Sequence, residues 1–377
     1  MHWFLLIFLT LYGAMNSYLF WKVFCVYPQL GYWRIAIAAF LLVMVAGPFI
    51  AHYLEKGHWL SLAKVAGFVC YSWMAVAFWF LVLMAAVDVW NLALRGAAGP
   101  FPAARLLLVP GKVYLPAIAA IIATLLTCGL LGAQDIQVRR LTIAVPGLPA
   151  GRPIRLMQIS DLHLGEYMNA RRFDRIIGLV QRESPDVLIS TGDMVDTSPA
   201  NLQWEADAFA AITPPMGKFA ILGNHEFYTG LPASLAFHEA AGFQVLRQQS
   251  VVLDGRVRLA GVDDPAGKRT GQDCFPDEAA ALAPGAAPTP TLLLKHQPRL
   301  DARSLGRFVI QLSGHTHGGQ VFPFQVISRR IYPYYRGLYD LSDGSSLYVN
   351  IGAGTWGPPI RLGAPAEVTV FTLTPAP

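Results

Sequence analysis

The sequence predicts an α/β domain preceded by a four-helix transmembrane region, and three observations lead to this prediction. Composition changes near residue 136: residues 1–136 contain seven Lys or Arg and three Asp or Glu, whereas the rest contains 22 basic and 21 acidic residues. Four apolar stretches precede this boundary, and short β-rich runs alternate with helix-like stretches after it. We therefore predict two domains, residues 1–136 and residues 137–377.

Each apolar stretch is long enough to cross a bilayer core of ~30 Å, which takes ~20 residues in a helix. Trp and Tyr gather near the ends of the stretches, as is typical of membrane interfaces. The alternative for the first stretch is that it is a secretory signal peptide. However, no charged segment precedes it, and no convincing small-residue cleavage site follows it. Asp88 lies near the end of the third stretch, where we expect a solvated helix end. The four predicted helices comprise residues 3–21, 33–51, 65–87 and 113–133.

An even number of spans places the N-terminus and the second domain on the same side of the membrane. Five basic residues flank the first and third loops between the predicted helices. Four lie on the opposite side, in the second loop and after the last helix. By the positive-inside rule, we expect an integral protein of the cell inner membrane whose domain 137–377 lies outside the cytoplasm. The five are Lys22, Arg34, Arg95, Arg105 and Lys112, and the four are Lys56, Lys64, Arg139 and Arg140.

The charge distribution argues against a nucleic-acid partner. The chain has a net charge of +5, but most of it comes from residues 1–136, and the second domain is nearly neutral. A nucleic-acid binder usually gathers Lys and Arg into a stripe on its binding domain, and no such run occurs here. The four cysteines do not form a disulfide framework either, because only Cys274 lies in the second domain.

In the second domain, five short apolar runs have the composition of buried strands. After the first run, Phe173, Ile176 and Val180 recur at helical spacing, and Asn169 is a plausible N-cap. Strands that alternate with helices predict a layered α/β domain. The predicted strands are residues 154–159, 187–190, 219–222, 291–294 and 308–312; further helices are predicted at 202–212 and 232–241, and a short helix followed by a surface loop at 276–290.

Metal-binding residue types follow each of the five predicted strands. Ligands of α/β sheets bind at the carboxyl ends of the strands, where loops from distant parts of the chain converge. Of the six histidines in the second domain, only His238 lies outside these clusters. The ordered set therefore predicts one site, although each cluster alone is weak evidence. Its members are Asp161 and His163, Asp193, Asn224 and His225, His296, and His315 and His317.

The predicted ligands mix imidazole, carboxylate and amide groups without clustered thiolates. This mixture excludes a structural zinc-finger or iron–sulfur centre and suits Mn, Fe, Zn or similar ions. There are more ligands than one ion needs, so we expect two divalent metal ions about 3.5 to 4 Å apart with a bridging carboxylate.

Taken together, these motifs resemble those of the calcineurin-like metallophosphoesterases, across roughly residues 137–377. Further segments are similar to a YkuE-like, membrane-associated branch of that superfamily. The resemblance implies a four-layer αββα sandwich of two facing sheets with helices outside. The motifs are Asp161-x-His163, Gly192-Asp193, Gly223-Asn224-His225-Glu226, His296 and Gly314-His315-x-His317, and the further segments are residues 159–165, 318–320 and 354–361.

The resemblance also implies roles for individual residues. One metal ion would be held by Asp161, His163 and His317, the other by Asn224, His296 and His315, and Asp193 would bridge them. His225 would not bind metal but would face the substrate, where an imidazole can protonate a leaving group. Asp196 and Glu226 are candidates for orienting the ligands. Arg361, in one of the similar segments, is a candidate for binding the phosphate of a substrate.

The expected function is hydrolysis of a phosphomonoester, phosphodiester or pyrophosphate bond by a metal-bridging hydroxide. Because the site is tethered to a membrane, a lipid-linked or envelope substrate is expected, and a soluble organic phosphate is the rival. Two alternatives belong to other classes. One is a non-hydrolytic scaffold or sensor on the same fold, which the intact motif set argues against. The other is that the spans form a transporter or channel with the hydrolase attached, but their lack of central charges favours a plain anchor.

Overall fold

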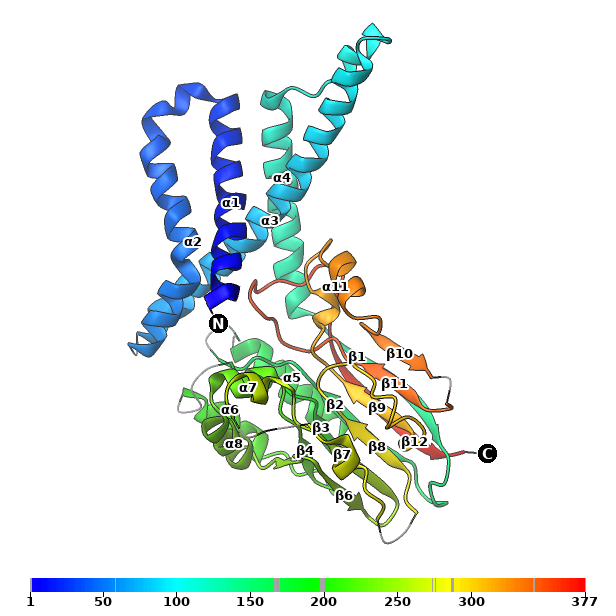
Figure 1. The fold of residues 1–377 in the computed structure, drawn as a ribbon. Helices are drawn as coiled ribbons and strands as arrows, with labels where there is room; N and C mark the ends of the chain where they lie inside the picture. Colours follow the sequence, from blue (N-terminus) through cyan, green and yellow to red (C-terminus); the bar gives the residue numbers. More distant parts are fainter. Residues whose placement is uncertain are drawn as a thin grey trace. The chain divides into compact units, whose positions relative to one another are not determined.

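A computed structural model describes residues 2–57, 59–165, 168, 170–196, 201–272, 274, 276–285, 288–341 and 343–376 of the chain (Figure 1). The chain divides into two compact units. A helical unit contains Met1–Leu130 and Gly357–Ile360, and an α/β unit contains Leu131–Trp356 and Arg361–Pro377. The predicted domain boundary at residue 136 stays a prediction. Asn169, the predicted N-cap, lies outside the described residues.

Three helical segments of the described chain are long and apolar enough to cross a membrane. They are Pro28–Lys56, Leu60–Ala97 and Gly111–Gln134, and they contain three of the four predicted spans. The remaining predicted span, residues 3–21, forms helix α1 (His2–Val26) but is not among the three. Because side chains at the start of α1 fall outside the described residues, this fourth span stays a prediction. The other elements of the unit are η1 (Pro28–Trp33), α2 (Arg34–Lys56), α3 (Leu60–Ala97), η2 (Pro102–Leu107) and α4 (Gly111–Gln134).

Helix α3 is longer than a single membrane crossing requires. Its 38 residues correspond to ~57 Å at the rise of an α-helix, well beyond a ~30 Å bilayer core. Asp88 consequently lies inside α3 rather than at its end, which corrects the expectation of a solvated terminus. It forms an ion pair with Lys22 of α1, at 2.5 Å, and accepts a hydrogen bond from Tyr18. A charged residue among these helices is therefore paired.

The first sheet of the α/β unit has the strand order β1-β12-β2-β3-β4-β5. Strands β2 to β5 run parallel, and β12 is antiparallel to β2 but parallel to β1. The parallel strands β2, β3 and β4 are three of the predicted ones. Their bounds are β1 (Ile136–Val145), β2 (Ile154–Ile159), β3 (Val187–Ser190), β4 (Lys218–Ala220), β5 (Gln244–Val245) and β12 (Ala366–Pro375).

The second sheet has the order β10-β11-β9-β8-β7-β6, in which β7, β8, β9 and β11 run parallel. The two outer strands are antiparallel to their neighbours. Strands β8 and β9 are the last two predicted strands. The bounds are β6 (Gln249–Leu253), β7 (Val257–Gly261), β8 (Thr291–Leu294), β9 (Ile310–Ser313), β10 (Gly337–Asp340) and β11 (Ser346–Val349).

The two sheets face each other across a shared apolar core. Leu156 and Ile189 of the first sheet pack in one cluster with Leu292 and Leu312 of the second. Side chains alternate across a strand, so Met157 points to the other face of the first sheet and packs in the cluster that contains residues of the covering helices. In Figure 1 these helices lie beside the green strands β2 to β4. They are α5 (Ala170–Glu183), α6 (Gln203–Ala210) and α8 (Leu231–Ala240).

The outer face of the second sheet is covered more thinly. Ala260 and Leu293 pack there against Leu282 and Phe308, next to the short helix α10 (Glu278–Ala281). The predicted α/β class and its two facing sheets between helical layers are therefore confirmed. Further short helices are α7 (Asn224–Thr229), α9 (Ala266–Arg269), η4 (His317–Gly319) and α11 (Gln325–Ile331).

Candidate metal centre

The predicted ligands follow the carboxyl ends of β2, β3, β4, β8 and β9, most of them in loops, whereas Asn224 and His317 begin the short helices α7 and η4. Five of these residues adopt a left-handed backbone conformation, which residues other than glycine rarely adopt. Such conformations cost free energy and persist where surrounding structure fixes them, often at functional sites. The five are Asp161 (φ 51°), His163 (φ 49°), Asp193 (φ 53°), His315 (φ 75°) and His317 (φ 49°).

Close packing of two loops explains a glycine beside the site. A Cβ atom at Gly192 would lie 2.6 Å from the backbone nitrogen of Gly223 and 2.7 Å from Nδ1 of His296. The loops after β3 and β4 therefore approach each other more closely than any side chain at residue 192 permits. This approach brings Asp193 and Asn224 together.

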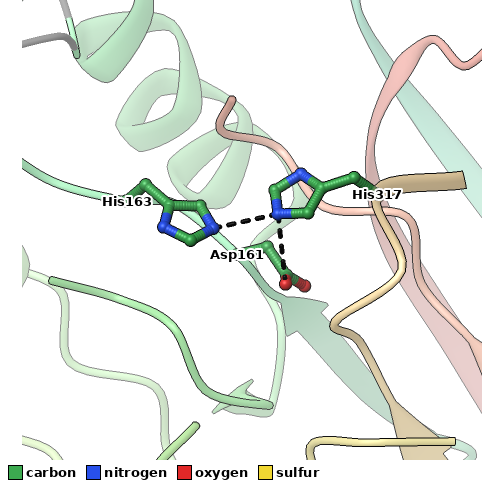
Figure 2. A group of neighbouring side chains, drawn as sticks. All are labelled: Asp161, His163 and His317. Carbon is green, nitrogen blue, oxygen red and sulfur yellow. Dashed lines mark hydrogen bonds and ion pairs between the residues drawn. The ribbon is translucent and has the colours of Figure 1, made fainter. Parts of the chain in front are cut away.

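Asp161, His163 and His317 form the first group of potential ligands (Figure 2). Nε2 of His163 lies 2.9 Å from Nε2 of His317, and the latter lies 3.6 Å from Oδ1 of Asp161. All three residues are buried. Their donor atoms converge as they would around a cation.

Asp193, His296 and His315 form the second group. Oδ2 of Asp193 lies 3.0 Å from Nε2 of His296, which lies 3.1 Å from Nδ1 of His315. Asn224 is buried, and its side-chain oxygen has no hydrogen-bond partner among the described residues. A buried carbonyl oxygen without a donor is costly unless a cation takes that place. Asp193 also lies in a group with His163 and His225, so it connects the two sides of the site.

The outer nitrogens of three candidate ligands are held by hydrogen-bonding groups. Nδ1 of His163 donates to Asp196 at 2.9 Å, and Nδ1 of His296 donates to the backbone oxygen of Thr191 at 2.7 Å. Nε2 of His315 lies 2.7 Å from the hydroxyl of Tyr332. Such partners fix the orientation and tautomer of metal-binding imidazoles, which leaves the inner nitrogen to bind the ion.

The protonation of two of the rings, those of His315 and His317, also suits metal binding. Burial, together with His296, lowers the pKa of His315 to about 3, and burial with His163 lowers the pKa of His317 well below its usual value. Both rings are therefore neutral at pH 7 and keep a lone pair for a ligand bond. Burial alone would raise the pKa of Asp193, but His296 and His225 hold it well below the usual range.

His225 occupies a different environment from the candidate ligands. Its Nδ1 lies 2.5 Å from Oδ1 of Asp196, and its backbone nitrogen donates to Asp193 at 2.9 Å. Burial lowers the pKa of His225, but Asp196 and Asp193 outweigh burial and raise it to about 10. The side chain is 16% exposed, and its ring packs edge-on against Tyr228 and Trp356. His225 is thus reachable from solvent at the side of the site.

Glu226 holds the loops of the site through the backbone. One carboxylate oxygen accepts from the nitrogens of Asp193 (3.0 Å) and Gly223 (2.7 Å). The other oxygen accepts from Met194 (2.6 Å) and Val195 (3.2 Å). Because Glu226 is fully buried, these four bonds form in a low-dielectric environment and fasten the β3 loop to the β4 loop.

The Glu226→Gln variant is expected to lower the free energy of unfolding by about 3 kcal/mol, because glutamine replaces one accepting oxygen with an amide group that faces two backbone N–H donors. Thermal unfolding of the full chain in detergent measures this effect. Glu239→Gln, at an exposed position of α8, is the matched control. Equal melting temperatures for the two variants would contradict the fastening role.

Arg361 lies deeper than a phosphate-binding residue usually does. Its side chain is buried, and its guanidinium donates to the backbone oxygens of Gly354, Ala364 and Ile351 at 2.8 to 3.1 Å. One of its nitrogens lies 3.3 Å from Nδ1 of His317. The donors that a phosphate would use are therefore largely occupied by the protein itself.

Two contacts of the site were not predicted from the sequence. Tyr332, whose hydroxyl holds His315, follows α11 and carries no motif. Thr191 acts through its backbone oxygen, so its side-chain type is not informative. Its position directly before Gly192-Asp193 is the one available signal, since residues that precede a ligand loop tend to contact it.

The Tyr332→Phe variant is expected to weaken metal binding about 10-fold, because the ring of His315 loses the partner that orients it. Titration of the metal-stripped full chain with a divalent cation measures the affinity. Tyr334→Phe, two residues away, removes the same hydroxyl from a side chain whose ring packs on Tyr339. Identical affinities for the two variants would show that Tyr332 does not orient His315.

Comparisons with known proteins agree with this geometry. The sequence profile of the calcineurin-like phosphoesterases matches residues 154–319. An uncharacterized metallophosphoesterase of Aquifex aeolicus is 42% identical over 239 residues, which cover 63% of this chain and 92% of that protein. YkuE of Bacillus subtilis, also an uncharacterized metallophosphoesterase, is 32% identical over 233 residues, or 58% of this chain and 78% of that protein.

The chain therefore belongs to the metallophosphoesterase family, and the predicted resemblance to it and to YkuE is confirmed. The similarity extends to the helical unit as well. The "transmembrane protein with metallophosphoesterase domain" of Bos taurus is 29% identical over 365 residues, which cover 92% of this chain and 81% of that protein. Together with the three long apolar helices, this similarity supports association with a membrane.

Proposed function

We propose that the chain is a membrane-anchored phosphoester hydrolase that uses two divalent metal ions. The observation that carries this proposal is the pair of donor groups connected by Asp193, and the buried, unpartnered side-chain oxygen of Asn224 supports it. One ion would bind to Asp161, His163 and His317, and the other to Asn224, His296 and His315. Mn, Fe, Zn or similar ions suit these mixed nitrogen and oxygen donors.

Ions bound there would lower the pKa of a shared water molecule and neutralise charge on the phosphoryl oxygens. Residues of the chain would support both effects by holding the ligands in position. Asp196, Thr191 and Tyr332 keep three imidazoles turned inward, and Glu226 keeps the loops of Asp193 and Asn224 in place. The bond broken would be a phosphomonoester, phosphodiester or pyrophosphate bond.

His225 is the proposed catalytic residue that is not a metal ligand. Its Nδ1 is bound to Asp196, so its Nε2 remains for a group outside the metal site. From this position, an Nε2–H donor can pass a proton to the leaving oxygen as the ester bond breaks. Arg361, by contrast, is proposed to position His317 and its loop rather than to bind a phosphate, because its guanidinium donates hydrogen bonds to three backbone oxygens.

We also propose that α1 is a fourth span, that the chain lies in the cell inner membrane, and that the α/β unit lies outside the cytoplasm. The support is the five-to-four balance of basic residues between the two sides. Modification of Val252→Cys by a membrane-impermeant maleimide in intact spheroplasts tests this topology, because Val252 is exposed on β6. Protection until the membrane is disrupted would place the unit in the cytoplasm.

The hydrolase proposal is tested with the full chain in detergent, stripped of metal and resupplied with Mn, Zn, Fe or Mg. p-Nitrophenyl phosphate and bis-p-nitrophenyl phosphate then distinguish monoester from diester hydrolysis. Metal-dependent turnover with about two bound ions per chain is the expected result. If the chain neither binds metal nor hydrolyses either ester, the proposal fails and the non-hydrolytic scaffold takes its place.

A further inference from the structure

The short helix α11 has its polarity reversed relative to an ordinary surface helix. Gln325 and Ser328 are 8% and 6% exposed, whereas Val326, Ile327 and Ile331 are 56%, 45% and 56% exposed. Water-soluble proteins usually bury the apolar residues of a helix and leave the polar ones in solvent. The reversal indicates that the outer face of α11 meets an apolar environment. Phe322 and Phe324, just before the helix, are also more than 40% exposed.

The charged residues next to this face in the sequence are all positive. Arg329 and Arg330 are exposed on the same helix, and Arg336 follows shortly after. No Asp or Glu occurs between Asp301 and Asp340. Apolar side chains combined with arginines are typical of helices that lie in the boundary between lipid headgroups and acyl chains, where they attract anionic lipids.

Among possible occupants of this face, a bilayer surface fits best. The same chain carries three helices long and apolar enough to cross a membrane, and the last of them, α4, ends one residue before β1. The chain itself thus keeps the α/β unit at a membrane. The arginines complement anionic lipid headgroups without the need for a separate protein partner.

The face is also connected directly to the candidate metal centre. Tyr332, which contacts His315, follows Ile331 in the chain. The backbone of α11 packs on the loop of His317, since a Cβ atom at Gly319 would lie 2.7 Å from Cα of Gln325. The helix that carries the exposed face is therefore in contact with the loop of a candidate ligand.

We propose that the outer face of α11 docks on an anionic lipid bilayer and that the site hydrolyses phosphoesters carried by membrane lipids. The second half of this proposal rests on the proposed hydrolase function, whereas the first half does not. The two halves can therefore be tested separately, with the full chain in nanodiscs of phosphatidylglycerol and phosphatidylcholine.

Docking is measured with a spin label at Ile327→Cys, after the exposed Cys25 and Cys128 are replaced by alanine. The label should be more accessible to oxygen, which dissolves in lipid, than to a water-soluble nickel chelate. A label at Val252→Cys, which is 47% exposed on β6, is the control and should show the opposite preference. If residue 327 behaves like residue 252, docking is disproved, whatever the chain hydrolyses.

The substrate class is measured with two phosphodiesters that share the same scissile bond, hexadecyl and methyl p-nitrophenyl phosphate. The wild-type chain should prefer the hexadecyl ester at least 10-fold, and Ile327→Glu should abolish most of this preference, whereas Val252→Glu should retain it. Equal rates on both esters would overturn the lipid-borne substrate. An inserted label without hydrolysis of either phosphodiester would overturn the lipid-borne phosphodiester as substrate but not the docking on a bilayer. The hydrolase function itself fails only if p-nitrophenyl phosphate, tested on the same preparation, is not hydrolysed either.

Discussion

Replacement of Asp193 by asparagine is expected to lower kcat/KM on nitrophenyl esters about 10³-fold and to reduce the bound metal from about two ions per chain to one or fewer. Asp193 lies in groups on both sides of the site, so its loss affects both proposed ions. An amide also lacks the negative charge of the carboxylate and has one accepting oxygen instead of two, so if that oxygen accepts from the backbone nitrogen of His225, an N–H group faces the proposed metal site.

Metal analysis after gel filtration and steady-state kinetics measure the two effects of Asp193→Asn. Asp174→Asn, at an exposed position of α5, makes the same chemical change outside the motifs and is expected to have no effect. If Asp193→Asn retained two ions and wild-type turnover, Asp193 would not be a bridging ligand.

The His225→Gln variant is expected to lower kcat between 10²- and 10⁴-fold for esters with poor leaving groups, with metal content unchanged. The reason is that an alkoxide needs a proton as it leaves, whereas p-nitrophenolate leaves readily without one. The loss should therefore be much smaller for p-nitrophenyl phosphate than for an alkyl phosphate. Asp196, which binds Nδ1 of His225, makes the same contact with His163, so only a change at His225 isolates the proton donor.

Parallel measurements of kcat on a series of phenyl phosphates with increasing leaving-group pKa test this role. A steeper dependence on leaving-group pKa in the variant than in the wild type supports proton donation by His225. Equal slopes, with the same loss for every ester, would mean that His225 acts by binding the substrate or by shaping the site.

Much of the candidate site could be predicted because parallel strands end at a common edge. Asp161, Asp193 and His296 are far apart in sequence, but each follows closely on a short apolar run. This pattern can be read without knowing how the side chains pack. The layered fold could be predicted for the same reason, since the alternation of strands and helices is a local property. The metal and catalytic roles themselves remain proposals.

Other features depend on tertiary packing and carry no local signal. Tyr332 reaches His315 only because α11 packs on the η4 loop, and Arg361 is buried only because surrounding backbone oxygens take up its donors. The pairing of Asp88 with Lys22 depends on how α1 and α3 lie together, which hydropathy does not reveal. The reversed polarity of α11 was missed because a seven-residue helix is too short for a clear periodic pattern.

The place of β12 in the first sheet has a consequence for how the α/β unit assembles during synthesis. Residues 366–375 lie between β1 and β2, and among the described strands of that sheet β1 pairs with β12 alone. Until these residues leave the ribosome, β1 and β2 each present an unsatisfied edge. The apolar helices are synthesised before the strands, so the sheet stays incomplete until residues 366–375 are available. Loss of residues 366–375 would therefore remove an internal strand and separate β1 from the rest of the sheet.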